Sequence, residues 1–215
     1  MEQLTSSVLL IDDHPMLRSG VKQLITSIAD FEVIGEAGDG ITGIALAKQS
    51  EPDIILLDIN LRDMSGLDIL LHLREQGVSS RILIFTVSDD KQDIITALKN
   101  GADGYLLKDM EPENLIESLK QVIAGKIMMD DNISQIILNH MRGQPHALEQ
   151  SHDVNLLTPR ELEIFNLLVQ GLSNKLIARQ LNIVDSTVKV HVKNILKKLN
   201  FKSRMEIAVW YLNSR

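Results

Sequence analysis

Reactive side chains follow four short apolar runs in the first half of the chain. Asp12 and Asp13 follow the first run, and Asp58 follows the second. Thr86 ends the third run, and Lys108 follows the fourth. Aliphatic runs without alternation are typical of strands buried on both faces of a parallel sheet, and open α/β sheets place their sites beyond the carboxyl ends of the strands. We therefore expect three carboxylates, a hydroxyl and an ammonium to meet at one edge of a sheet.

Such a set of side chains predicts a phosphoryl-acceptor site. Carboxylates held close together need a cation, and hard oxygen ligands suit Mg²⁺. With the metal bound, Asp58 can attack a phosphoryl group, while Lys108 and Thr86 can contact its oxygens. Acids at strand ends can also be ordinary solvated loop residues, which explains one of them but not all four strand ends. We expect His14 to be an exposed residue at the start of a helix, not a metal ligand.

Strand and helix patterns alternate from the N-terminus to about residue 126. This alternation predicts a doubly wound, flavodoxin-like α/β domain over residues 1–126 with five parallel strands. The predicted strands are 8–11, 31–36, 53–57, 82–86 and 104–107, and the predicted helices are 15–29, 43–49, 67–75, 91–100 and 112–124. Residues 127–153 form the predicted linker, with one helix at 132–141 and a polar Gly/Pro-containing tether after it.

Residues 154–215 carry repeated helix start and stop signals. Thr158 opens a capping box followed by proline, Ser173 is a second N-cap, Asp185 or Ser186 is a third, and Ser203 opens another capping box. We therefore predict an all-α domain of four helices that resembles a helix-turn-helix module. Residues 188–193 alternate as a surface strand would, but the apolar stripe that continues to residue 199 favours a helix.

Charge separates the two predicted domains. Residues 1–130 carry a net charge of -11, whereas residues 154–215 carry +6. The basic module suggests nucleic acid as its partner, although charge alone leaves a membrane surface open. The chain has no cysteine and no apolar stretch long enough to span a bilayer, so we expect a soluble, cytoplasmic protein.

The pattern of Asp12-Asp13, Asp58, Thr86 and Lys108 resembles the receiver domain of two-component response regulators, over about residues 7–125. The resemblance implies that Asp58 accepts phosphate from a sensor histidine kinase.

Further roles follow from the same resemblance. Asp13 and Asp58 would ligate Mg²⁺ together with the main-chain carbonyl of Asn60, and Asp12 would help largely through water. Thr86 and Tyr105 would carry the switch from the phosphate to the face formed by the fourth and fifth βα units. Without the resemblance, Tyr105 could equally be a half-buried strand residue.

The segments 157–163, 171–178 and 186–193 resemble the LuxR-type DNA-binding signature, and the combination with a receiver resembles the NarL/FixJ family. The resemblance extends to nitrate/nitrite regulators, which makes nitrate or nitrite a candidate signal. It implies that Lys189, Val190 and Lys193 read bases. It also implies phosphate contacts by a second set of residues: Asn174, Lys175, Arg179, Thr187 and Lys197. The final helix would form a dimer contact through Ile207, Ala208, Trp210 and Tyr211, although Trp210 could instead be a core residue.

We therefore expect a phosphorylation-controlled transcription factor, not an enzyme. Its receiver would cover the DNA-reading helix until Asp58 is phosphorylated, after which two copies would bind promoter DNA, with RNA polymerase as a further partner. The rival from another class is a phosphatase with Asp58 as nucleophile, but such enzymes usually need an acid where this chain has Asn60. A further alternative is a regulator that does not respond to phosphorylation. In such a protein the set of acidic site residues should be incomplete.

Overall fold

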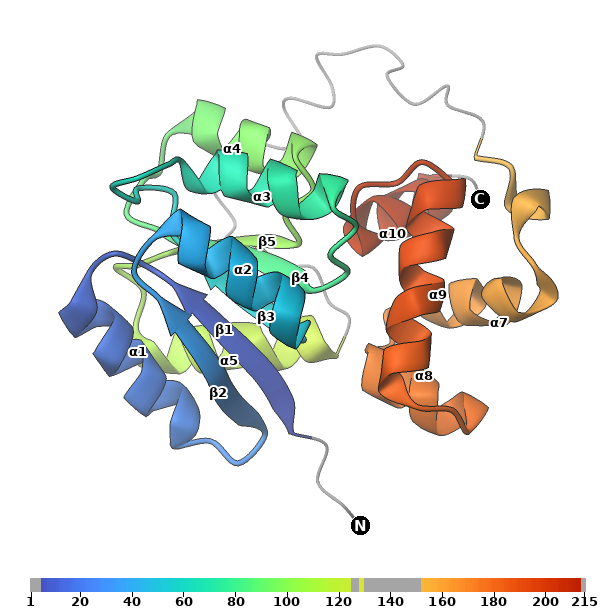
Figure 1. The fold of residues 1–215 in the computed structure, drawn as a ribbon, viewed down its shortest axis with the longest axis horizontal. Coiled ribbons are helices and arrows are strands. Elements are labelled where there is room, and N and C mark those ends of the chain that lie inside the picture. The colour runs from blue at the N-terminus through green and yellow to red at the C-terminus, as the bar shows by residue number, and fades with distance from the viewer. Residues whose placement is uncertain (1–4, 125–127, 130–151, 214–215) are drawn as a thin grey trace.

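The computed structural model describes residues 5–124, 128–129 and 152–213, which form two domains (Figure 1). The N-terminal domain is a sheet between helices, and the C-terminal domain is helical. The predicted helix at 132–141 lies outside the described residues. Among the described helices, none has both the length and the apolar character needed to cross a membrane.

The sheet is parallel throughout and has the order β2-β1-β3-β4-β5-β6. Its strands are β1 (Ser6–Ile11), β2 (Phe31–Ala37), β3 (Ile54–Leu57), β4 (Arg81–Thr86), β5 (Gly104–Leu107) and β6 (Met128–Met129). All five predicted strands are present. The prediction of five strands omitted β6, because two residues give no periodic signal.

Helices cover both faces of the sheet, as the predicted doubly wound fold requires. They are α1 (Pro15–Thr26), α2 (Gly40–Ser50), α3 (Gly66–Glu75), α4 (Lys91–Lys99) and α5 (Pro112–Ile123). Buried residues of α2, α3 and α4 pack on one face, and those of α1 and α5 pack on the other. Each fully buried Leu or Ile stabilises the fold by about 1.5–3 kcal/mol relative to exposure. The two aliphatic cores therefore fix the sheet whose edge carries the reactive side chains.

The C-terminal domain contains the four predicted helices, preceded by a short 3-10 turn, η1 (Val154–Leu156). The helices are α7 (Pro159–Leu168), α8 (Asn174–Leu181), α9 (Asp185–Lys198) and α10 (Arg204–Asn213). Residues of α7, α8, α9 and α10 share one aliphatic core. Residues 188–193 are helical as predicted, because Val188 and Val192 are both fully buried in this core.

Two predicted helix caps differ in the structure. Helix α9 begins one or two residues earlier than expected. Its N-cap is Val184, which makes no side-chain capping bond, so neither Asp185 nor Ser186 is the cap. At α10, the Glu206 main-chain N–H donates to Ser203 as a capping box requires. The Glu206 carboxylate, however, accepts from the main chain of Lys202 instead of Ser203. Only half of the second capping box therefore forms.

The first capping box is complete, and it yields a stability prediction. The Thr158 hydroxyl accepts from the Glu161 main chain, and Glu161 accepts in return from the Thr158 main chain at 2.8 Å. Thr158→Ala is expected to lower the free energy of unfolding of the C-terminal domain by about 1 kcal/mol. Urea denaturation measures this change. Ser186→Ala is the matched control, because Ser186 caps no helix, and its expected change is below about 0.5 kcal/mol. Equal changes in both variants would contradict the assignment.

Candidate functional site

The carboxylates meet at the carboxyl edge of the sheet because β1 and β3 are neighbours in register, with Ile11 paired to Leu57. The next residues along these strands are Asp12 and Asp58, both buried. The Lys108 ammonium reaches them from the end of β5 and lies 2.6 Å from Asp58 Oδ2 and 2.8 Å from Asp12 Oδ2. One ammonium thus contacts two buried carboxylates, which leaves local negative charge unbalanced.

Unsatisfied oxygens indicate what this group can bind. Asp58 Oδ1 is buried and has no hydrogen-bond partner among the described residues, and buried Asp13 Oδ1 has only the His14 ring nitrogen nearby, at 2.9 Å. Ligand atoms of Asp12, Asp13, His14 and Asp58 lie within 4.8 Å of one another. A buried carboxylate oxygen without a donor is costly, and a hard divalent cation relieves that cost. The donor set therefore fits a metal with oxygen ligands.

His14 is exposed at the start of α1, as predicted, but its ring is not remote from the site. Its Nδ1 lies 2.9 Å from Asp13 Oδ1, and its side chain is 61% exposed. Arg62, which the sequence analysis missed, also contacts Asp13, with Nε 3.0 Å from Oδ2. Arg62 lies four residues after Asp58, and no local pattern marks it as part of the site.

The loop after Asp58 depends on a glycine. Gly66 donates its main-chain N–H to the Ile59 carbonyl, and a Cβ added at Gly66 would lie 2.0 Å from the Asp58 carbonyl oxygen. Because only glycine permits this approach of two main chains, Gly66 holds the turn that follows Asp58. Asn60 lies in the same loop, is exposed, and forms an isolated bridge to Ser65.

Thr86 and Tyr105 lie on neighbouring strands and act on one loop. Thr86 is fully buried, and its hydroxyl accepts from the Ser88 main chain at 3.3 Å. The Tyr105 hydroxyl donates to the Ser88 carbonyl at 2.8 Å. Burial raises the pKa of Tyr105, so its hydroxyl stays a donor. The loop from Val87 to Asp90 is therefore held by both residues through Ser88, which the sequence analysis did not identify.

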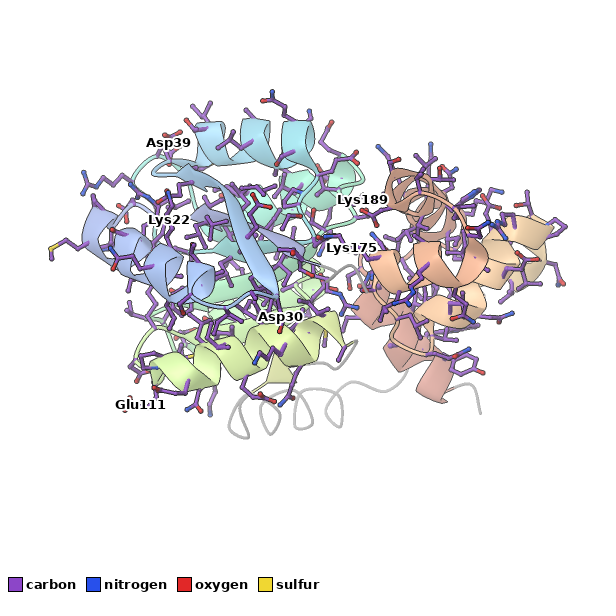
Figure 2. The ribbon with its side chains drawn as sticks, turned by 90° about the horizontal axis from the view of Figure 1, so that it is seen from below. Lys22, Asp30, Asp39, Glu111, Lys175 and Lys189 are labelled. Carbon is purple, nitrogen blue, oxygen red and sulfur yellow. The ribbon has the colours of Figure 1, made fainter. Side chains whose placement is uncertain are left out.

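The expected DNA-reading side chains of α9 contact the receiver. Lys189 donates to the Glu51 carbonyl at 2.6 Å, and Lys193 donates to the Gln76 carbonyl at 3.1 Å. Figure 2 shows Lys189 and Lys175 directed from the helical domain toward the sheet domain. Val190, by contrast, is 58% exposed. Two of the three expected base readers therefore bind main-chain carbonyls of the receiver in this arrangement, although Lys193 stays exposed.

The residues expected to contact DNA phosphates are not all on one surface. Arg179 and Lys197 are exposed and Thr187 is partly exposed. Lys175 forms an ion pair with Asp53 at 2.7 Å. Asn174 is buried and accepts a hydrogen bond from Arg204 at 2.6 Å, so it is unavailable to DNA in this conformation.

The final helix supports only part of the expected dimer surface. Ile207 is fully buried in the core of its own domain, so its assignment to a dimer contact is wrong for this conformation. Trp210 packs edge-on against the rings of His152 and Phe165, which agrees with the alternative that it is a core residue. Ala208 and Tyr211 remain partly exposed.

Both domains match known families. Residues 8–120 match the model of the response regulator receiver domain, and residues 155–211 match that of the bacterial regulatory proteins of the luxR family. With an acidic site at the carboxyl edge of a doubly wound sheet and a helical DNA-binding module behind it, the chain belongs to the response regulators that carry a LuxR-type DNA-binding domain.

Relatives of known description share the whole length of the chain. The nitrate/nitrite response regulator protein NarL of Escherichia coli (strain K12) is 52% identical over 99% of this chain and 98% of that protein. NarP of the same organism is 43% identical over 97% of this chain and 95% of that protein. The solved response regulator ChrA of a heme-sensing two-component system is 30% identical, covers 99% of this chain and 98% of that one, and superposes with a TM-score of 0.52. These relatives are regulators, which favours the regulator over the phosphatase.

Proposed function

We propose that this protein is a phosphorylation-activated, DNA-binding transcription regulator of a two-component system, with Asp58 as the phosphoryl acceptor. The observation that carries the proposal is the presence, in one chain, of the acceptor group around Asp58 and of helix α9, the proposed DNA-recognition helix, bonded to the receiver. A regulator that ignores phosphate would have no reason to keep Asp58, Thr86 and Lys108 together in one buried group.

The chain's own residues supply most of the acceptor chemistry. The Asp58 carboxylate attacks the phosphorus of a sensor kinase phosphohistidine, the bond from phosphorus to the histidine nitrogen breaks, and an acyl phosphate remains on Asp58. Lys108 pairs with one phosphoryl oxygen, and the Thr86 hydroxyl turns toward another. Asp12, Asp13, Asp58 and the Asn60 carbonyl would hold Mg²⁺, which supplies charge neutralisation between the incoming phosphoryl group and the acids.

Helix α4 offers a route from the acceptor to the covered helix. Its first turn is bonded to the loop from Val87 to Asp90, because Ser88 donates to Asp93 at 2.6 Å. Its last residue, Lys99, accepts at its carbonyl from Lys202 of the DNA-binding domain at 2.8 Å. When Thr86 turns toward the phosphoryl group, Ser88 loses one partner, and a shift of α4 reaches the contact with Lys202. Phosphorylation thereby favours an open state, in the sense of a two-state population shift.

Cross-linking tests the closed state directly. The chain has no cysteine, so the double variant Gln76→Cys/Lys193→Cys offers two thiols where the structure has a contact. A short thiol-reactive cross-linker is expected to join them in untreated protein. Beryllofluoride with Mg²⁺, an aspartyl-phosphate mimic, is expected to suppress this product, but not when Asp58→Asn is added. Equal cross-linking with and without the mimic would contradict release of the recognition helix.

The Lys175–Asp53 ion pair gives a second prediction. Burial alone would raise the pKa of Asp53, but hydrogen bonds from Lys175 and Ser7 outweigh it and lower this pKa. Asp53→Asn is expected to raise the affinity of unphosphorylated protein for specific DNA by up to about fivefold, since a partly exposed ion pair contributes up to about 1 kcal/mol. Closure lowers the pKa of Asp53. At a pH above the pKa that Asp53 has in the open state, the ion pair therefore stabilises the closed state in full, and this stabilisation is lost as the pH falls through the lower pKa of the closed state.

Fluorescence anisotropy with a promoter fragment measures the effect of Asp53→Asn. Asp68→Asn is its control, because it removes the same charge from an exposed position at the start of α3. A rise in affinity for Asp68→Asn as large as that for Asp53→Asn would assign the effect to overall charge instead of the interdomain contact.

The signal and partners follow from the named relatives. Because NarL and NarP are nitrate/nitrite response regulators, we propose that this chain acts in a nitrate- or nitrite-responsive system with a sensor histidine kinase as phosphodonor. Binding of two copies to an inverted repeat and contact with RNA polymerase complete the proposal.

A further inference from the structure

A small cavity lies between the two domains, at the amino edge of the sheet and away from the acceptor site. Its volume is about 20 Å³, which suffices for one water-sized particle. The receiver contributes Ser6, Asp53 and Arg81 to its wall, and the DNA-binding domain contributes Lys175 and Arg204. Three cationic side chains and a single carboxylate therefore surround a space that only the closed arrangement creates.

Two of these cations form no ion pair within 4.0 Å in the described part of the chain, although the charges of Asp53 and Asp103 act on both from farther away. Arg81 and Arg204 are each only 9% exposed. Arg81 donates to the Gly171 carbonyl at 3.3 Å and Arg204 to the Asn174 amide oxygen at 2.6 Å, which are neutral acceptors. The nearby Arg74 differs, because it lies 2.6 Å from Asp103 in a buried ion pair. Lys175 is already paired with Asp53. Asp103 and Asp53 are thus each in close contact with another cation, so Arg81 and Arg204 are the two cations at the cavity without a close counter-ion.

Closing the domains over two unpaired guanidinium groups is costly, because burial removes water from each and brings like charges together. Burial and the positive charge of Arg81 lower the pKa of Arg204 to about 9, which reflects the same cost. An anion between the two groups removes this cost. The cavity also adjoins the start of α8, whose N-cap is Ser173, so the positive end of the helix dipole favours negative charge there.

We propose that this cavity binds one small monovalent inorganic anion, of the size of chloride, which bridges Arg81 and Arg204 and stabilises the closed state. Opening separates the two arginines and destroys the site. The anion therefore acts against phosphorylation, and its concentration sets how much of the unphosphorylated protein is open. The chloride-loaded closed state is favoured by a factor that grows with concentration, about elevenfold at ten times the dissociation constant.

Energy transfer between two dyes tests this proposal in the full-length, unphosphorylated protein. Ile41→Cys and Leu156→Cys place one dye on each domain, because both positions are well exposed and the chain has no cysteine of its own. Sodium glutamate is replaced by sodium chloride at constant ionic strength, so that screening is unchanged. We expect a saturable rise in the closed fraction with chloride. A closed fraction that does not change as chloride replaces glutamate would overturn the proposal.

Two variants separate the anion site from the rest of the interface. Arg204→Gln is expected to lose the chloride response. Lys189→Gln removes an interdomain contact outside the cavity, so it should lower the closed fraction yet keep the chloride response. A chloride response that persists in Arg204→Gln would overturn the proposal.

Chloride NMR line width of the wild-type protein gives an independent measurement if Arg204→Gln fails to close at all. The chloride signal is expected to be broadened by untreated protein, and this broadening should fall when beryllofluoride shifts the protein to the open state. Equal line widths in the two samples would overturn the anion site, even if the release of the recognition helix were established by cross-linking.

Discussion

Replacing Asp58 with asparagine is expected to abolish activation of DNA binding. The amide cannot form an acyl phosphate, and it removes the negative charge of a carboxylate whose Oδ1 is buried without a hydrogen-bond partner. Coupling between two sites typically amounts to about 5–150-fold in affinity, and the whole of this increase should be lost. The measurement compares specific DNA affinity with and without a small-molecule phosphodonor and Mg²⁺.

The exposed acid Asp68 provides a control on the same edge of the receiver. Asp68→Asn should leave the phosphodonor-dependent increase intact, because Asp68 lies at the start of α3 and outside the acceptor group. If Asp58→Asn bound specific DNA as tightly as phosphorylated wild type, the switch would have to be abandoned.

Removal of Lys189 is expected to have the second-largest effect, and it should act on discrimination between DNA sequences. A lysine contact to a base edge contributes roughly 1–3 kcal/mol of discrimination. Lys189→Ala should therefore weaken binding to the specific site far more than to random DNA. Lys189 also donates to Glu51 in the closed state, so the measurement must use beryllofluoride-treated protein, in which that contact is already released.

Lys197 lies on the same helix and serves as the comparison. It is exposed and is expected to contact phosphate, so Lys197→Ala should weaken binding to all sequences alike. It should also reduce the slope of log affinity against log salt concentration by about one, since one fewer counterion is released. A uniform loss for Lys189→Ala as well would show that Lys189 contacts phosphate and not a base.

The sheet and the acceptor group were predictable because both depend on local sequence. Four aliphatic runs mark the strands, and parallel neighbours necessarily bring Asp12, Asp58 and Lys108 to one edge. Gly66 and Arg62 could not be assigned in this way. Their roles depend on how the loop after β3 folds back on Asp58 and Asp13, which no local pattern encodes.

Contacts between the domains were the least predictable part. Lysines at spacing of four on α9 suggest DNA phosphates and bases, and in the structure Lys189 and Lys193 bind main-chain carbonyls of the receiver instead. A carbonyl at the end of a helix or in a turn has no sequence signature as an acceptor. The same holds for the buried pair of Arg74 and Asp103, which forms only once α3 packs beside β5.

The most direct test of the central claim is selection of binding sites from a random DNA pool by the full-length protein with Mg²⁺, with and without beryllofluoride. The proposed function predicts enrichment of an inverted repeat only in the sample that carries the mimic, because only then is the recognition helix free and the dimer formed. Equal enrichment in both samples would contradict phosphate control, and enrichment in neither would contradict DNA binding itself.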